Sequence, residues 1–167
     1  FKNIKYIRNK TNMGKGYSME RGANLSKYEI IFFCDADLRK LTPEIVDAII
    51  EPVLNGETEM FIGIRDNFTQ KTWKFVAHWS GERALKKELW MKVPLFYKKG
   101  YRIEVGLNNF VKKFRGGFKS KLFKYYQTYS EVKRGFFTGT KFRWIIYYDV
   151  FLGFLRFNFY DRWKKFD

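Results

Sequence analysis

The near-continuous apolar run over residues 29–34 has the length and composition of a strand that is covered on both faces. A helix is predicted before it, over residues 17–26. Another is predicted after it, where Thr42 and Pro43 match an N-cap and the first helical position. Residues 60–64 again have the pattern of a strand. This alternation predicts an α/β fold with a mostly parallel sheet flanked by helices.

The remaining segments are less regular. A short alternating segment predicts a strand over residues 4–8. A helix is predicted over 80–91, and strands are predicted over 100–107 and 121–129. The last element, residues 142–164, is predicted to be a C-terminal amphipathic helix.

Charge and aromatic residues are unevenly distributed along the 167 residues. The net charge is +16, yet residues 1–83 hold 13 Lys and Arg against 11 acidic residues, whereas residues 84–167 hold 20 against 6. Of the 35 aromatic residues, 24 also lie in the second half. A hydrophobic content of 46% provides enough apolar side chains for a core and disfavours a disordered chain. The two halves are therefore expected to have different roles.

Two carboxylates, Asp35 and Asp37, directly follow the strand predicted at residues 29–34. Ligands of α/β sheets gather at the carboxyl ends of strands. Carboxylates separated by one residue present oxygen ligands to a hard cation such as Mg²⁺ or Mn²⁺. The same pattern occurs in ordinary surface turns. Its position favours a metal or ligand site, because uncompensated carboxylates beside a buried strand are costly.

The segment Asn12-Met13-Gly14-Lys15-Gly16 forms a predicted loop that opens a helix. Its glycines allow a tight backbone, and backbone N–H groups together with Lys15 are suited to an anionic ligand. The spacing matches neither a Walker A loop nor the dinucleotide-binding fingerprint. Taken alone, this loop is better explained by an ordinary turn.

Taken in order, these motifs, with Gly22 between them and Leu38 and Pro43 after them, closely resemble those of family 2 glycosyltransferases of the GT-A fold. The nearest likeness is to dolichyl- or polyprenyl-phosphate sugar transferases. It continues through Ser-Gly-Glu-Arg-Ala-Leu at residues 80–85 and Gly-Tyr-Arg-Ile-Glu-Val-Gly-Leu at 100–107. The resemblance implies metal-dependent transfer of a sugar from a nucleotide diphosphate sugar to polyprenyl phosphate or another membrane-associated glycan acceptor.

The resemblance also implies roles for individual residues. Asp35 and Asp37 are expected to be catalytic and to hold Mg²⁺ or Mn²⁺. A UDP- or GDP-sugar donor is expected to meet the following residues: Asn12, Gly14, Lys15, Asp35 and Arg65. The acceptor is expected to meet Gly81, Arg83 and Glu104, and Glu104 is the candidate catalytic base or acceptor-positioning carboxylate. An ion pair of Glu104 with Arg102 or Lys99 is the alternative.

The resemblance starts partway into the family's pattern, because such enzymes begin with a strand and helix that bind the nucleobase. Residues 1–115 are therefore expected to form a partial, N-terminally truncated GT-A catalytic domain. Residues 116–167 are expected to form a basic aromatic extension at a membrane interface. On this interpretation the 167-residue polypeptide by itself is inactive or weakly active.

Aromatic residues alternate with Lys and Arg through residues 142–166 at the density of an interfacial helix on anionic lipid. The apolar part is too short to span a bilayer. The alternative is a helix that packs on the sheet and leaves its basic groups in solvent. Single-stranded nucleic acid also suits such a composition, but no recognised motif supports it as a partner.

Two further residues bear on the location and the metal. Cys34 is the only cysteine, which excludes a disulfide framework and fits a reducing compartment. The predicted location is therefore cytoplasmic, peripheral to the inner face of a membrane. His78, the only histidine, is expected to be a packing or hydrogen-bonding residue, with a third metal ligand as the alternative.

Two other functions stay open at this point. One is a non-catalytic basic aromatic module that binds anionic lipid or nucleic acid. The other is an enzyme similar to the nucleotidylyltransferases, which also use Asp and a metal but need a glycine-rich N-terminal loop that this sequence does not show.

Overall fold

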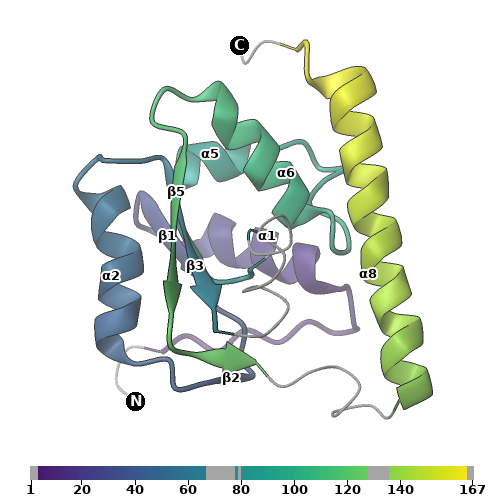
Figure 1. Cartoon of the computed structure of the whole chain (residues 1–167), viewed down its shortest axis with the longest axis horizontal. Coiled ribbons are helices and arrows are strands. Elements are labelled where there is room, and N and C mark those ends of the chain that lie inside the picture. The colour runs from purple at the N-terminus through teal and green to yellow at the C-terminus, as the bar shows by residue number, and fades with distance from the viewer. Residues whose placement is uncertain (1–3, 67–77, 79, 128–135, 165–167) are drawn as a thin grey trace.

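The computed structural model describes residues 4–66, 78, 80–127 and 136–164, which form a four-stranded sheet and a two-stranded sheet flanked by helices (Figure 1). The strands are β1 (Ile30–Phe33), β2 (Leu38–Arg39), β3 (Met60–Arg65), β4 (Arg83–Lys86), β5 (Phe118–Phe123) and β6 (Tyr126–Gln127). The helices are α1 (Lys15–Leu25), α2 (Pro43–Leu54), α5 (Lys87–Lys92), α6 (Ile103–Phe110) and α8 (Phe136–Arg156). A 3₁₀ turn (Val111–Lys113) follows α6, and a π-helical turn (Phe157–Asp161) follows α8.

The larger sheet has the strand order β1-β4-β3-β5 and is mixed. β4 lies between β1 and β3 and runs antiparallel to both, whereas β3 and β5 are parallel. β1, β3 and β5 therefore point the same way. The expectation of a mostly parallel sheet is corrected, because β4 runs in the opposite direction. The sequence pattern missed β4 because Arg83, Ala84 and Leu85 are all buried, which leaves no alternation of apolar and polar residues.

Helices cover both faces of this sheet. Ile49 and Val53 of α2 pack on one face against Phe61 and Ala84. On the other face, α1, α5 and α6 enclose a larger core around Trp90 of α5. α8 lies outside this layer, next to α6 (Figure 1).

Several predicted elements are confirmed, namely α1, β1, α2 and β3, and the final helix is present although it begins earlier than predicted, at Phe136. The strand predicted over residues 4–8 is wrong, because that segment has no regular structure and its Ile4 and Tyr6 are 71% and 82% exposed. Without a buried face, its alternation has nothing to pack against.

The elements predicted in the middle of the chain are corrected. Residues 80–91 contain the strand β4 followed by the helix α5, not one helix. Residues 100–107, predicted as a strand, lead into α6, where Ile103, Leu107 and Phe110 are buried at helical spacing. The strand predicted over 121–129 is divided between β5 and β6, and residues 128–129 lie outside the described part.

The expected domain boundary at residue 115 falls just before β5. Pairing of β5 with β3, and of β6 with β2, carries both sheets past that boundary. Beyond residue 115, α8 and the π-helical turn after it are the described elements that belong to neither sheet. Along the described ranges, no helix has the length and apolar character needed to cross a membrane.

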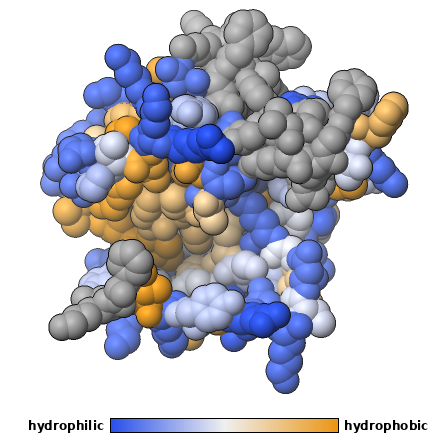
Figure 2. Space-filling model, turned by 90° about the horizontal axis from the view of Figure 1, so that it is seen from below, coloured by the Kyte–Doolittle hydropathy of each residue, from blue (hydrophilic) through white to orange (hydrophobic). Residues whose placement is uncertain are grey.

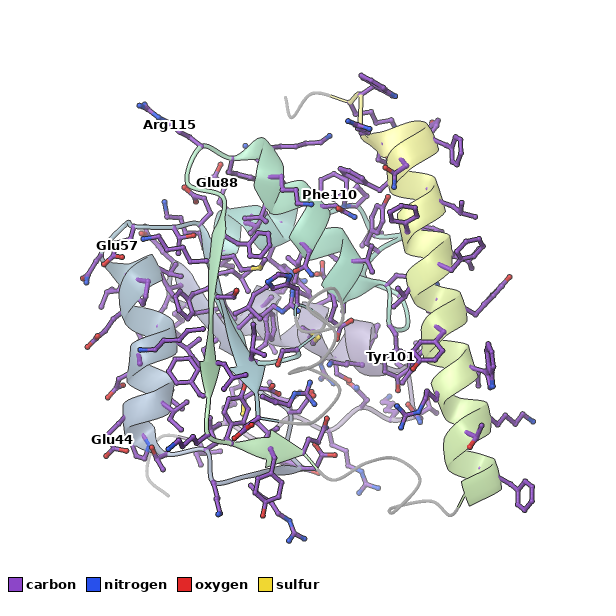
Figure 3. All side chains as sticks on the ribbon, in the orientation of Figure 1. Glu44, Glu57, Glu88, Tyr101, Phe110 and Arg115 are labelled. Atoms are coloured by element: carbon purple, nitrogen blue, oxygen red, sulfur yellow. The ribbon has the colours of Figure 1, made fainter. Side chains whose placement is uncertain are left out.

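α8 packs on the core through one side only. Asp149, Val150 and Gly153 face inward, and a Cβ atom at Gly153 would already lie 3.5 Å from the Val105 side chain of α6. Figure 3 shows Phe110 on the side of the core that faces α8, and Phe110 stacks edge-on against Phe157 just after α8. The other side of α8 carries side chains that project away from the rest of the molecule (Figure 3).

Candidate functional site

The candidate site lies at the carboxyl ends of β1 and β3, at the lower edge of the molecule in Figure 1. Asp35 comes two residues after β1, and Arg65 is the last residue of β3. Figure 2 looks onto the lower edge and shows apolar surface between hydrophilic groups. The parallel direction of β1 and β3 brings their ends to the same edge, as expected for ligand sites in such sheets.

Asp35 is held between two cations. Its Oδ1 lies 3.2 Å from Lys15 Nζ, and its Oδ2 lies 3.7 Å from Arg65 Nη2. Gly81 backs the carboxylate so closely that a Cβ atom there would lie 2.7 Å from Oδ2. Gly81 thus makes room for Asp35, and the acceptor contact predicted for Gly81 stays a prediction.

Lys15 also forms an ion pair with Glu104, with 2.9 Å between Nζ and Oε1. Burial alone would lower the pKa of Lys15, but the Glu104 and Asp35 carboxylates outweigh it and raise that pKa. Lys15 is the first residue of α1 and Glu104 lies in the first turn of α6, so this pair joins two helices at the site. Arg102, the alternative partner, pairs with Asp149 of α8 instead.

The loop before α1 is shaped by its own side chains. Asn12 Oδ1 accepts a hydrogen bond of 3.0 Å from the Gly14 amide, and Gly14 has a φ of 82°, which favours glycine. Gly16 packs against the Lys98 backbone. The loop therefore places Lys15 at the site. The contacts of Asn12 and Gly14 with the sugar donor stay predictions.

A buried carboxylate lies beneath Arg65. Glu82 is 0% exposed, and its Oε2 lies 2.9 Å from Arg65 Nε, 2.9 Å from Ser80 Oγ and 3.1 Å from the Tyr125 hydroxyl. Tyr125 also donates to the Gly63 carbonyl at 2.6 Å. Burial, together with the charge of Glu82, raises the pKa of Tyr125. These contacts fix the Arg65 guanidinium at the edge of the site.

Arg83 is placed differently from what the sequence predicts. It is 1% exposed, and its guanidinium donates to Asn108 Oδ1 at 3.1 Å, to the His78 carbonyl at 3.4 Å and to the Ser80 carbonyl. Burial lowers the pKa of Arg83. Because its N–H donors bond to groups inside the fold, Arg83 supports the site from below and does not face a sugar acceptor.

Asp37 is exposed. Gln127 of β6 donates from Nε2 to Asp37 Oδ1, and its Oε1 accepts a hydrogen bond from Arg65 Nη1. Sequence reasoning missed Gln127, Tyr125 and the role of Glu82. No local signal marks the first two, because they reach the site through pairing with strands that lie far away in the sequence.

The interpretation of His78 as a packing residue is supported. Its Nε2 lies 3.2 Å from Ser120 Oγ, and its ring packs edge-on against Phe118. Burial and the nearby Arg83 charge lower its pKa. No group of three His, Cys, Asp or Glu residues in the described part could hold a metal ion by itself.

A second candidate surface is the outward side of α8. Its exposed aromatic and apolar side chains, here called the α8 outer face, are Phe137, Trp144, Ile145, Tyr147, Tyr148, Phe151 and Phe154. The two acidic residues in the described part of this region, Asp149 and Asp161, point inward. Asp149 pairs with Arg102, and Asp161, which is 1% exposed, accepts from Tyr97 and Arg156. The α8 outer face thus combines aromatic groups with no carboxylate.

Comparison with known proteins identifies the family. The sequence profile of glycosyl transferase family 2 matches residues 1–126, so this chain belongs to that family. No curated protein matches the sequence.

Solved structures of glucosyl-3-phosphoglycerate synthase from Mycobacterium tuberculosis are similar. One, in complex with Mn²⁺, UDP-glucose and phosphoglyceric acid, has a TM-score of 0.62 and 18% identity over 82% of this chain and 55% of the other. Another, with Mg²⁺ and UDP, has a TM-score of 0.60 and 17% identity over 82% and 54%. The α/β GT-A-like fold is thereby confirmed, and the chain spans about 55% of the length of these structures.

Proposed function

We propose that this chain contributes to a glycosyltransferase that moves a sugar from a nucleotide diphosphate sugar to an acceptor with the help of Mg²⁺ or Mn²⁺. The observation that carries the proposal is the cluster at the end of β1, where Lys15, Asp35 and Arg65 meet beside an exposed Asp37 in a family 2 domain. The similar synthase structures hold Mn²⁺ or Mg²⁺ together with UDP or UDP-glucose.

The donor atoms of the site fit a hard divalent cation. Mg²⁺ keeps several waters and is typically bound by one or two carboxylates plus substrate phosphates, so a complete protein cage is not required. Asp35 already faces two cations, whereas Asp37 is exposed. Asp37 would therefore be the main ligand, with Asp35 next to it. When bound, the ion would neutralise the charge that develops on the diphosphate leaving group.

The cationic side chains would receive the donor. Lys15 and Arg65 approach Asp35 from two sides, so diphosphate oxygens that enter there would compete for the same N–H donors. Arg65 is held in place by Glu82 and does not need to be ordered when a ligand binds. Its planar guanidinium suits bidentate contact with phosphate oxygens.

Glu104 would act on the acceptor side. Its ion pair with Lys15 keeps a carboxylate at the site, 7% exposed, where it could accept a proton from an acceptor hydroxyl. A phosphate acceptor would not need that step. In that case the role of Glu104 would be to hold Lys15 in position.

The acceptor in this proposal is polyprenyl phosphate or another membrane-associated glycan, and the chain lies at the inner face of a membrane. Support comes from the α8 outer face, where Trp144 and Phe151 are 69% and 55% exposed. Exposed aromatic side chains among Lys and Arg suit the interface of an anionic membrane.

The first test measures UDP and GDP binding to the full-length protein by isothermal titration calorimetry with and without Mn²⁺ or Mg²⁺. Wild-type protein should bind one nucleotide in a metal-dependent way. Asp37→Ala and Asp35→Ala should remove that dependence, while Asp47→Ala, an exposed carboxylate on α2, should leave it unchanged. Unchanged metal-dependent binding in the first two variants would contradict the metal assignment.

The second test sediments the protein with phosphatidylglycerol or phosphatidylcholine vesicles across a salt series. Binding to the anionic vesicles should persist in part at high salt and should weaken in a Trp144→Ser/Phe151→Ser variant. Leu54→Ser/Leu95→Ser removes two apolar side chains of 66% and 68% exposure elsewhere and serves as the control. Salt-sensitive binding to an oligonucleotide with no vesicle binding would support the non-catalytic alternative instead.

A further inference from the structure

We infer that Gln127 is a positioning residue that orients the Asp37 carboxylate by tying it to Arg65. This inference rests on the proposed function, because it assigns Asp37 to the metal. It concerns a residue that no motif in the sequence marks. The geometry that supports it comes from β6, a strand of two residues.

Strand pairing holds the backbone next to Asp37. β6 pairs antiparallel with β2, and the register places Gln127 opposite Leu38 and Tyr126 opposite Arg39. β2 begins directly after Asp37. The pairing therefore fixes the backbone at the end of the Asp35-Ala36-Asp37 turn.

The Gln127 side chain lies between Asp37 and Arg65 and bonds to both. The carboxamide of Gln127 donates from Nε2 to Asp37 Oδ1 and accepts at Oε1 from Arg65 Nη1. A carboxamide both donates and accepts, which matches a carboxylate on one side and a guanidinium on the other. A glutamate would repel Asp37, and a lysine would repel Arg65. Glutamine therefore satisfies both neighbours without adding charge.

Arg65, the other partner of Gln127, is anchored in the core. Arg65 is 7% exposed and is fixed by the fully buried Glu82, with 2.9 Å between Nε and Oε2. Tyr125, two residues before Gln127, contacts the same Glu82 oxygen at 3.1 Å. The segment after β5 thus anchors itself in the core with Tyr125 and reaches the site with Gln127. An exposed carboxylate is in this way connected to a buried ion pair.

Groups that orient metal ligands contribute strongly to metal affinity, and their loss typically weakens it by about 10- to 100-fold. Gln127→Leu removes both hydrogen bonds while keeping a side chain of comparable bulk. We expect it to weaken Mn²⁺ affinity in the presence of UDP by about tenfold or more. UDP binding without metal should change little, because Arg65 keeps its contact with Glu82.

The experiment titrates Mn²⁺ into the full-length protein with saturating UDP and follows free Mn²⁺ by electron paramagnetic resonance. Tyr126→Leu is the matched control, since Tyr126 belongs to the same strand but packs on Lys40, away from Asp37. It should retain wild-type Mn²⁺ affinity. Gln127→Asn, which is too short to reach both neighbours, should behave like Gln127→Leu and serves in its place if that variant does not fold.

Three results would overturn the inference. Wild-type Mn²⁺ affinity in a folded Gln127→Leu or Gln127→Asn protein would show that Asp37 needs no support. Equal weakening in Tyr126→Leu would assign the effect to strand pairing. Absence of metal-dependent UDP binding in the wild type would refute the proposed function itself and this inference with it, so the two failures are distinguishable.

Discussion

Replacing Glu82 by glutamine tests whether the buried pair beneath the site stabilises the fold. Glu82 is 0% exposed, and its Oε2 has three partners within 3.1 Å, one of them the Arg65 guanidinium. Breaking a buried ion pair costs about 3–5 kcal/mol, because the remaining charge stays buried without compensation. Glutamine keeps the volume and one acceptor oxygen, and Arg65 also contacts Asp35. The expected loss is therefore at the lower end, about 3 kcal/mol.

The free energy of unfolding is measured by urea denaturation, with a thermal melt as a second readout. For a chain of this size, 1 kcal/mol shifts Tm by about 2–4 °C, so Glu82→Gln should lower Tm by about 6–12 °C. Glu57→Gln makes the same change in an exposed pair with Lys119, whose side chains are 49% and 54% exposed. That control should cost less than about 1 kcal/mol.

The reasoning would be refuted if Glu82→Gln were no more destabilising than Glu57→Gln. Such a result would mean that Asp35 and Gln127 alone compensate the buried charge of Arg65. A further readout separates stability from function. Because Glu82 holds Arg65, nucleotide affinity should fall in Glu82→Gln even at temperatures where the variant is fully folded.

Two further predictions concern the glycines of α1 and the tyrosines of the core. Gly16→Ala should destabilise the fold, because its Cβ would overlap the Lys98 carbonyl. Gly22→Ala on the same helix meets nothing within 4 Å and should be neutral or stabilising. Thermal melts measure both effects, and equal shifts in Tm would contradict the packing argument. Burial raises the pKa of Tyr97 and Tyr125, so these phenols stay protonated in the folded chain when unfolded tyrosines ionise near about pH 10. The unfolded state then binds fewer protons, so the free energy of unfolding should fall as pH rises above about 10; urea titrations at successive pH values check this, and a flat profile would contradict it.

Much of the first half of the chain could be predicted from local patterns. The apolar run of β1, the Pro43 start of α2 and the turn with Asp35 and Asp37 are each specified by neighbouring residues. The order of these motifs also led to the right family. The middle of the chain was harder, because residues buried on every side have no polar face, and periodicity then does not separate a strand from a helix.

Prediction of the candidate site from the sequence was limited in the same way. Asp35, Lys15 and Arg65 were selected from the sequence, and the structure brings them together with Glu104. Arg83 was selected with them, yet it is buried under the site. Residue type and order alone did not distinguish an arginine that faces a ligand from one that is buried beneath the site. The burial of an arginine depends on the strands that pack next to it.

Sequence alone therefore determined the family, the α/β class and the position of the acidic turn, because short-range patterns of burial and turn residues encode them. Only the tertiary structure decided the reversed direction of β4, the inward direction of Asp149 and Asp161 and the contact of Gln127 with Asp37. The last of these joins residues 90 positions apart. Such contacts depend on strand pairing across the whole fold, which no local pattern of residues records.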